Sequence, residues 1–93
     1  MTEIVINTRH SAFSLSKLGR DHYKKLAKLD EPPDDYYIPR DDPRLVQTVR
    51  DLGKDAYGYL TELKIVAIPD DVDWLIEEFD GCEHIAEKGR TWF

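Results

Sequence analysis

The chain has 93 residues, of which 41% are hydrophobic and 34% are charged. This composition is typical of one folded domain over residues 1–93 rather than of a disordered segment. The formal net charge of −6 argues against sequence-independent binding to long DNA or RNA, which needs many contacts between basic side chains and phosphates. A small anion held by two or three local arginines remains compatible with this charge.

The charges are unevenly distributed along the chain. Residues 14–29 contain one acidic residue, Asp21, and carry the basic residues Lys17, Arg20, Lys24, Lys25 and Lys28. Residues 70–87 have no basic residue and carry Asp70, Asp71, Asp73, Glu77, Glu78, Asp80, Glu83 and Glu87. Regions of opposite charge attract each other, either within one chain or between two chains.

The N-terminal residues 1–13 lack the charged stretch and apolar run of a signal peptide. No segment is long and apolar enough to span a bilayer. Cys82 is the only cysteine, so an internal disulfide is excluded. We therefore expect a cytoplasmic protein.

In chain order, the first predicted element is a strand over the β-branched residues 3–8. A helix is predicted from Ser14, as its N-cap, to about Leu29. Apolar residues recur there at steps of three and four, which predicts a buried face formed by Leu15, Leu18, His22, Leu26 and Leu29. On that face, a partly buried and hydrogen-bonded His22 is favoured over a catalytic histidine.

The next predicted elements are a loop and a second helix. Residues 30–42 predict a loop, because Pro32, Pro33 and Pro39 exclude a helix there. The second helix is predicted to begin with Asp42 as N-cap and Pro43 at its first position, which is favoured for proline. It ends at Gly53 or Gly58, and its apolar face is formed by Leu45, Val46, Val49 and Leu52.

The last third of the chain predicts strands. Residues 62–68 predict a strand that ends before Pro69. Residues 72–79 allow a helix capped by Asp71, but Asp80-Gly81 is typical of a two-residue hairpin turn. We favour the hairpin, which places Ile76 opposite Ile85 and Glu77 opposite His84. The predicted fold is α+β, a mostly antiparallel sheet of about four strands packed around two helices.

No group of residues has the spacing of a catalytic or metal site. Cys82 and His84 are close in sequence, but a structural zinc site needs about four ligands. We interpret them as a half-buried thiol beside a surface imidazole. The serines before the first helix lack a glycine-flanked nucleophile turn, and adjacent acidic residues point to opposite faces of a strand. We therefore expect no enzyme activity, no metal and no cofactor.

Three features suit the recognition of an anion or a ring. Arg40 is fixed between two prolines, and its forked guanidinium suits phosphate oxygens. The rings of Tyr57 and Tyr59 flank Gly58 and suit stacking on a base. The chain ends in Arg90-Thr91-Trp92-Phe93. Each feature also has a structural interpretation: an ion pair of Arg40 with Asp41 or Asp42, docking of the C-terminal residues, or a core shared by two subunits.

Several stretches, spread over most of the chain, carry a family resemblance. They are Ile-Val-Ile-Asn-Thr at 4–8, Phe-Ser-Leu-Ser at 13–16, Ile-Pro-Arg-Asp-Asp-Pro-Arg-Leu-Val at 38–46, Glu-Leu-Lys-Ile-Val at 62–66, Ile-Pro-Asp-Asp-Val at 68–72, Phe-Asp-Gly at 79–81 and Arg-Thr-Trp at 90–92. Together they resemble a family of short phage and prophage proteins, the anti-Thoeris sponges. Such proteins sequester cyclic ADP-ribose isomers, and some relatives also hold cyclic oligonucleotides made by antiphage defence.

The resemblance implies a homodimer or higher homo-oligomer with a recessed pocket near a subunit boundary. There an aromatic ring stacks on the base and arginines near the C-terminus meet the phosphates. The resemblance carries over Asn7, Arg40, Arg90 and Trp92 as ligand-binding residues, with Tyr59 or Leu60 in place of the stacking aromatic. Arg9 and Phe13 complete the candidate ligand-binding residues. The family's Cys-aromatic-Gly-Gly is Arg9-His10-Ser11-Ala12 in this chain. Loss of two glycines closes off the approach of the backbone to a ligand while Arg9 adds a cation, so the ligand can differ from that of the relatives.

We therefore expect a non-enzymatic sponge in the host cell cytoplasm. It would bind a cyclic nucleotide immune signal, so that the downstream defence effector stays silent. The alternative is an acidic inhibitor that blocks a host defence or toxin protein through residues 70–87. A nucleotide-processing enzyme is a third interpretation. The many aromatic rings also predict an oligomer, with the second helix and the final strands as its contact.

Overall fold

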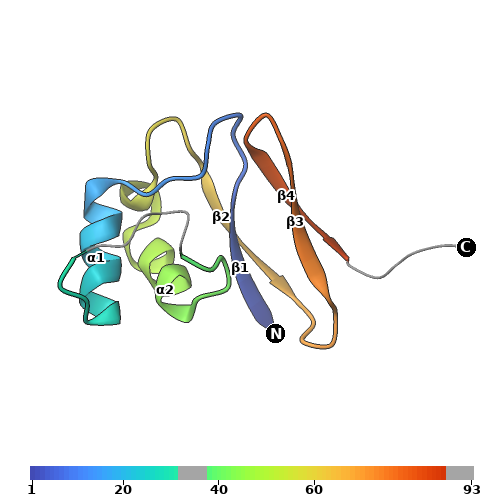
Figure 1. Cartoon of the computed structure of the whole chain (residues 1–93), viewed down its shortest axis with the longest axis horizontal. Helices are drawn as coiled ribbons and strands as arrows, with labels where there is room; N and C mark the ends of the chain where they lie inside the picture. The colour runs from blue at the N-terminus through green and yellow to red at the C-terminus, as the bar shows by residue number, and fades with distance from the viewer. Residues whose placement is uncertain (32–37, 88–93) are drawn as a thin grey trace, which may run out of the picture.

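Figure 1 shows the computed structural model, which describes residues 1–31 and 38–87. Its elements are β1 (Thr2–Asn7), α1 (Lys17–Ala27), α2 (Pro43–Leu52), the short 3-10 helix η2 (Gly53–Ala56), β2 (Leu63–Ile68), β3 (Trp74–Phe79) and β4 (Cys82–Glu87). The two α-helices and four antiparallel strands of these residues confirm the predicted α+β class. No helix in the same residues is long and apolar enough to cross a membrane.

Helix α2 begins and ends where the sequence predicts. Asp42 is its N-cap and accepts a hydrogen bond from the Arg44 backbone N–H at 2.8 Å. Pro43 occupies the first position, where no backbone N–H is needed, and Gly53 caps the other end. The predicted apolar face is confirmed, since it packs into the core through Leu45, Val46, Val49 and Leu52.

The Asp42 carboxylate also ties α1 to α2. Tyr23 on α1 donates its hydroxyl hydrogen to Asp42 Oδ2 over 2.7 Å. Burial alone raises the pKa of Asp42, but the hydrogen bonds from Tyr23 and Arg44 outweigh burial and hold this pKa below its ordinary value. Burial and the same hydrogen bond raise the pKa of the Tyr23 hydroxyl. At neutral pH the pair is therefore a hydroxyl donor and a carboxylate acceptor.

Helix α1 is shorter than predicted. Its N-cap is Ser16 rather than Ser14, and Lys28 ends it in the left-handed conformation. His22 is partly buried, and its Nε2 lies 2.9 Å from Asp51 Oδ2. The expectation of a partly buried, hydrogen-bonded His22 is thus confirmed.

The buried face of α1 is not the predicted one. Gly19 and Tyr23 are buried, whereas Leu18 and Leu29 are exposed. Gly19 lies so close to η2 that an added Cβ atom would stand 3.0 Å from the Ala56 carbonyl oxygen. Because this close approach turns the glycine inward, the leucines turn outward. The prediction of a buried leucine face was therefore wrong, although Leu15, just before the helix, is buried.

The β1–β2 pair separates two apolar layers. The strands are antiparallel, with Val5 opposite Ile65 and Ile4 opposite Val66. Successive side chains of a strand point to opposite faces, so Val5 faces the helices while Ile4 and Ile6 face the other side; all three are buried. The β3–β4 hairpin lies on that other side in Figure 1. The helix-side core also contains Phe13, Leu15, Tyr23, Ile38, Leu45, Val46, Val49, Ala56 and Leu63.

Strands β3 and β4 form the favoured hairpin, so the helical alternative for residues 72–79 was wrong. Asp80 and Gly81 make the turn, both with positive φ, as a type I′ turn requires. The predicted register is confirmed, with Ile76 opposite Ile85 and Glu77 opposite His84. In the described part of the chain, the four strands form two separate two-stranded sheets. The hairpin is thus a third layer beside β1 (Figure 1).

Candidate functional site

Three loops meet at one end of the molecule, at the top of Figure 1: the loop after β1, the loop between η2 and β2, and the β3–β4 turn. An open pocket of about 220 Å³ lies at this end and is lined by Arg9, Lys54, Tyr57, Thr61 and Glu62. The lining combines two cations, an aromatic ring, a hydroxyl and a carboxylate. Such a set suits a polar ligand that carries both an anionic group and a ring.

Asn7 fixes the backbone on both sides of this pocket. Its Oδ1 accepts hydrogen bonds from the backbone N–H groups of Arg9 (3.1 Å) and Glu62 (3.2 Å). Its Nδ2 faces the carbonyl oxygens of Arg9 (3.1 Å), Gly81 (3.2 Å) and Ser11. The side chain is fully buried. The predicted site residue Asn7 therefore positions the pocket walls and ties them to the hairpin turn.

Backbone hydrogen bonds hold the loop before β2 against the segment after β1. Gly58 N donates to Ser14 O at 3.0 Å, and Thr8 N donates to Glu62 O at 2.9 Å. The Thr61 hydroxyl donates to Gly58 O at 2.9 Å and closes the loop on itself. These hydrogen bonds therefore hold in place the loop that lines the pocket.

The two cations of the pocket are accessible. Arg9 Nε stands 3.8 Å from Glu62 Oε2, and these side chains are 64% and 58% exposed. An exposed ion pair of this kind contributes about 0–1 kcal/mol, so the guanidinium can turn toward a ligand at little cost. Lys54 is exposed and makes no ion pair with a described residue. Arg9 and Lys54 together suit one phosphate group.

Tyr59 and Leu60 stand at the tip of the same loop, 85% and 61% exposed. The Ser11 hydroxyl donates to Tyr59 O at 3.3 Å, and Leu60 adopts a left-handed φ of 56°. The structure therefore brings Arg9, Tyr59 and Leu60 to one end of the molecule. The ring that lines the pocket, however, is that of Tyr57.

Arg40 and Phe13 belong to a buried cluster around Glu83. Arg40 forms an ion pair with Glu83 Oε1, and its guanidinium carbon lies 3.6 Å from the centre of the Phe13 ring. Glu83 is 7% exposed and also accepts a hydrogen bond from Asn7 N at 2.8 Å. The structural interpretation of the sequence, an ion pair of Arg40 with Asp41 or Asp42, was therefore wrong. Two predicted site residues, Asn7 and Arg40, thus meet at one carboxylate that no motif marked, and a third, Phe13, lies against Arg40.

Sequence reasoning missed part of the pocket. Lys54 and Thr61 carry no motif, and Glu62 belongs to a motif stretch without being predicted as a site residue. These three residues reach the pocket only because the loop before β2 folds against the segment after β1. Arg90 and Trp92, the remaining predicted ligand residues, lie outside the described residues.

Cys82 and His84 do not belong to a metal site in the part of the chain that the structure describes, where no group of three His, Cys, Asp or Glu residues could hold a metal ion. Cys82 is partly buried, and its thiol lies 3.5 Å from Thr8 O. The His84 ring is exposed and lies 3.2 Å from Glu77 Oε2. The interpretation of a half-buried thiol and a surface imidazole is confirmed.

The fold and the pocket define a small α+β domain with an open pocket of mixed charge at one end. Comparisons with family models, with curated proteins and with solved structures give no match. We therefore infer a function from the side chains of the pocket and from the motifs of the sequence.

Proposed function

We propose that this protein is a non-enzymatic binder that sequesters a small anionic nucleotide, either a cyclic ADP-ribose isomer or a cyclic oligonucleotide. The observation that carries the proposal is the open pocket whose lining combines Arg9 and Lys54 with the ring of Tyr57. The sequence motifs that resemble the phage anti-Thoeris sponges support a role in silencing an immune signal. In that role the protein removes the signal from the host cytoplasm and acts on no effector directly.

The pocket residues divide the recognition of such a ligand between them. The Arg9 guanidinium and the Lys54 ammonium bind phosphate oxygens, and the Tyr57 ring stacks on the base. The pocket volume of about 220 Å³ is below the ~300–1,000 Å³ of typical small-molecule sites. The pocket therefore encloses one phosphate and part of a ring, and the rest of the ligand extends along the exposed Tyr59.

Arg40 takes a supporting role in this proposal. Its charge is paired with the buried Glu83 and its flat face covers Phe13. Turning it toward a ligand would leave Glu83 buried without its partner, which is costly. We therefore assign the phosphate contacts to Arg9 and Lys54.

The same pocket supports binding without conversion of the ligand. Glu62 is the one carboxylate of the lining, and Arg9 pairs with it. General acid–base catalysis on a phosphate or glycosidic bond usually needs two groups that can exchange protons with the reacting atoms. A single carboxylate already paired with a cation suits a binding site better.

Replacing Arg9 with alanine is expected to weaken nucleotide binding about 10- to 100-fold, because a charge-assisted contact contributes about 1.5–3 kcal/mol. Isothermal titration calorimetry with cyclic ADP-ribose isomers and cyclic dinucleotides measures this change. The melting temperature should stay nearly constant, since Arg9 makes only an exposed ion pair. Lys64→Ala is the matched control, because Lys64 is an exposed cation on β2 outside the pocket. Equal affinities of Arg9→Ala and Lys64→Ala would assign the ligand to another surface.

A further inference from the structure

Helix α1 presents a basic, partly apolar stripe to the solvent. Leu18 and Lys25 are seven residues apart, which places them on one side of the helix, and Leu29 follows the C-cap residue Lys28 at its end. Leu18 and Leu29 are 61% and 42% exposed. Lys17, Lys24, Lys25 and Lys28 make no ion pair with any described residue. We call this surface, formed by Lys17, Leu18, Lys24, Lys25, Lys28 and Leu29, the α1 stripe.

The outer face of the β3–β4 hairpin has the opposite charge and is also partly apolar. Strand alternation places Leu75, Glu77 and Phe79 on the face away from β1, because the buried Glu83 lies on the other face, opposite Glu78. Phe79 is 71% exposed, and the neighbouring acidic side chains Asp73 and Asp80 are exposed as well. We call this surface, formed by Asp73, Leu75, Glu77, Phe79 and Asp80, the hairpin face.

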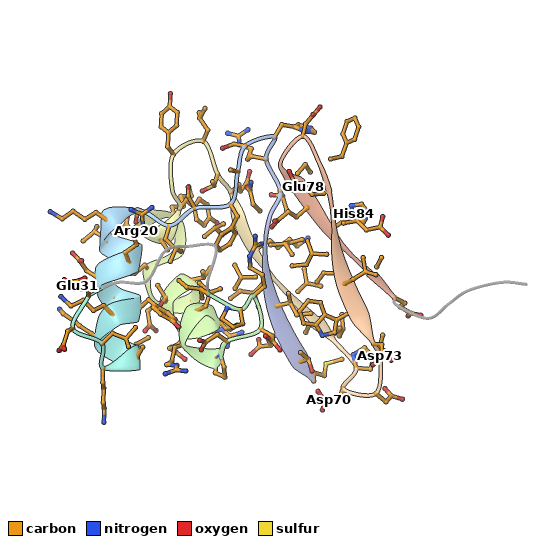
Figure 2. The ribbon with its side chains drawn as sticks, in the orientation of Figure 1. Arg20, Glu31, Asp70, Asp73, Glu78 and His84 are labelled. Carbon is orange, nitrogen blue, oxygen red and sulfur yellow. The ribbon has the colours of Figure 1, made fainter. Side chains whose placement is uncertain are left out.

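The α1 stripe and the hairpin face stand at opposite ends of the molecule. Figure 1 shows the β1–β2 pair and α2 between α1 and the hairpin, and Figure 2 shows Arg20 at one end with Asp73 and His84 at the other. The two surfaces therefore cannot meet within one chain. They can meet only between two molecules.

We propose that a second copy of this chain docks head to tail, with its α1 stripe on the hairpin face of the first. A symmetric contact of stripe on stripe would place lysines against lysines, and a contact of hairpin on hairpin would place carboxylates against carboxylates. The head-to-tail contact instead pairs Lys25 and its neighbours with Glu77 and Asp73, and it covers Leu18, Leu29 and Phe79. Such a contact repeats from one molecule to the next and forms a ring or a chain of subunits.

Other occupants fit the α1 stripe less well. An anionic membrane would attract its lysines, but it would repel the rest of a molecule whose net charge is −6. The helix that the sequence suggested as a contact, α2, exposes the polar side chains Arg44, Gln47, Arg50 and Asp51. The final strands, which the sequence also predicts as an oligomer contact, form the β3–β4 hairpin and are part of the proposed contact.

Two variants that each lose one surface test this proposal. The stripe variant carries Leu18→Gln and Lys25→Glu, and the face variant carries Glu77→Gln and Phe79→Gln. Sedimentation velocity should show that the wild type associates and that added salt weakens its association. Each variant alone should be a monomer with an unchanged circular dichroism spectrum. An equimolar mixture should form a one-to-one complex and nothing larger, because each variant keeps the surface that the other has lost.

Lys64→Glu is the control for charge, and it should associate like the wild type. A monomeric wild type at every concentration would overturn the proposal. So would a symmetric dimer of either variant alone, a mixture that does not associate, or binding of the α1 stripe to anionic vesicles without self-association. The four substitutions lie outside the pocket lining. Nucleotide binding by the variants therefore tests the proposed function independently.

Discussion

Replacing Glu83 with glutamine is expected to lower the free energy of unfolding by about 3–5 kcal/mol. This is the usual cost of removing one partner of a buried ion pair, because the other charge stays buried without a counter-charge. The Glu83 side chain is 7% exposed, and it pairs with Arg40 while accepting a hydrogen bond from Asn7 N at 2.8 Å. A glutamine keeps the shape but leaves the Arg40 guanidinium, 21% exposed, without its counter-charge. Urea unfolding followed by circular dichroism measures the change.

Glu77→Gln is the matched control on the same hairpin. Glu77 is also paired, with His84 at 3.2 Å, but both side chains are more than half exposed. Loss of this exposed ion pair should change the free energy of unfolding by less than about 1 kcal/mol. If Glu83→Gln were as mild as Glu77→Gln, the Glu83 cluster would not hold the hairpin to the body of the protein.

The second large effect is expected from Gly81→Ala, which should lower the free energy of unfolding by more than about 4 kcal/mol. Gly81 has a φ of +86°, and an added Cβ atom would stand 2.3 Å from the Ser11 carbonyl oxygen. The clash involves backbone that Asn7 holds in place through Ser11 O and Gly81 O. Neither partner can move without breaking that contact.

Gly53→Ala separates the clash from the effect of backbone conformation. Gly53 also has a positive φ, +55°, but nothing lies within 4 Å of an added Cβ atom. This substitution should cost only the conformational strain, about 1–3 kcal/mol. Equal destabilisation by the two substitutions in thermal unfolding would show that the hairpin turn does not press against the loop after β1.

The hairpin and α2 could be predicted because their signals are local. Asp80-Gly81 selects a two-residue turn, and the turn fixes the register in which Ile76 faces Ile85. Asp42 and Pro43 mark the start of α2 within two neighbouring residues. In both cases a few adjacent residues determine the backbone, so no knowledge of the tertiary structure is needed.

The buried face of α1 could not be predicted, because it depends on a contact with another segment. The leucine spacing favoured Leu18 and Leu26, but the close approach of Gly19 to Ala56 decides which side faces the core. A glycine has no side chain, so it contributes nothing to a hydrophobic pattern. A buried glycine contact is therefore invisible to periodicity.

The candidate site was only partly predictable for the same reason. Tyr59 and Leu60 come from the motif comparison and Arg9 from its departure from the family pattern, and the structure places all three at one end of the molecule. Lys54 and Thr61 join Arg9 only because the Gly58 backbone bonds to Ser14. The Arg40–Glu83 pair joins residues 43 positions apart in the chain, and no local pattern links them.

Recovery of a bound ligand tests the sponge proposal most directly. The purified protein is incubated with a panel of cyclic ADP-ribose isomers and cyclic oligonucleotides, freed of unbound ligand and heated, and the released compounds are identified by mass spectrometry. We predict that one cyclic nucleotide returns chemically intact. At a thousandfold excess over Kd, this ligand should stabilise the folded state by about 4 kcal/mol and raise Tm by roughly 15–30 °C. A hydrolysed product would instead indicate an enzyme. If no nucleotide is recovered while Asp73→Asn, Glu77→Gln and Asp80→Asn, which replace exposed carboxylates of the hairpin, together abolish protection of cells against defence, the protein is an acidic inhibitor and the sponge proposal is wrong.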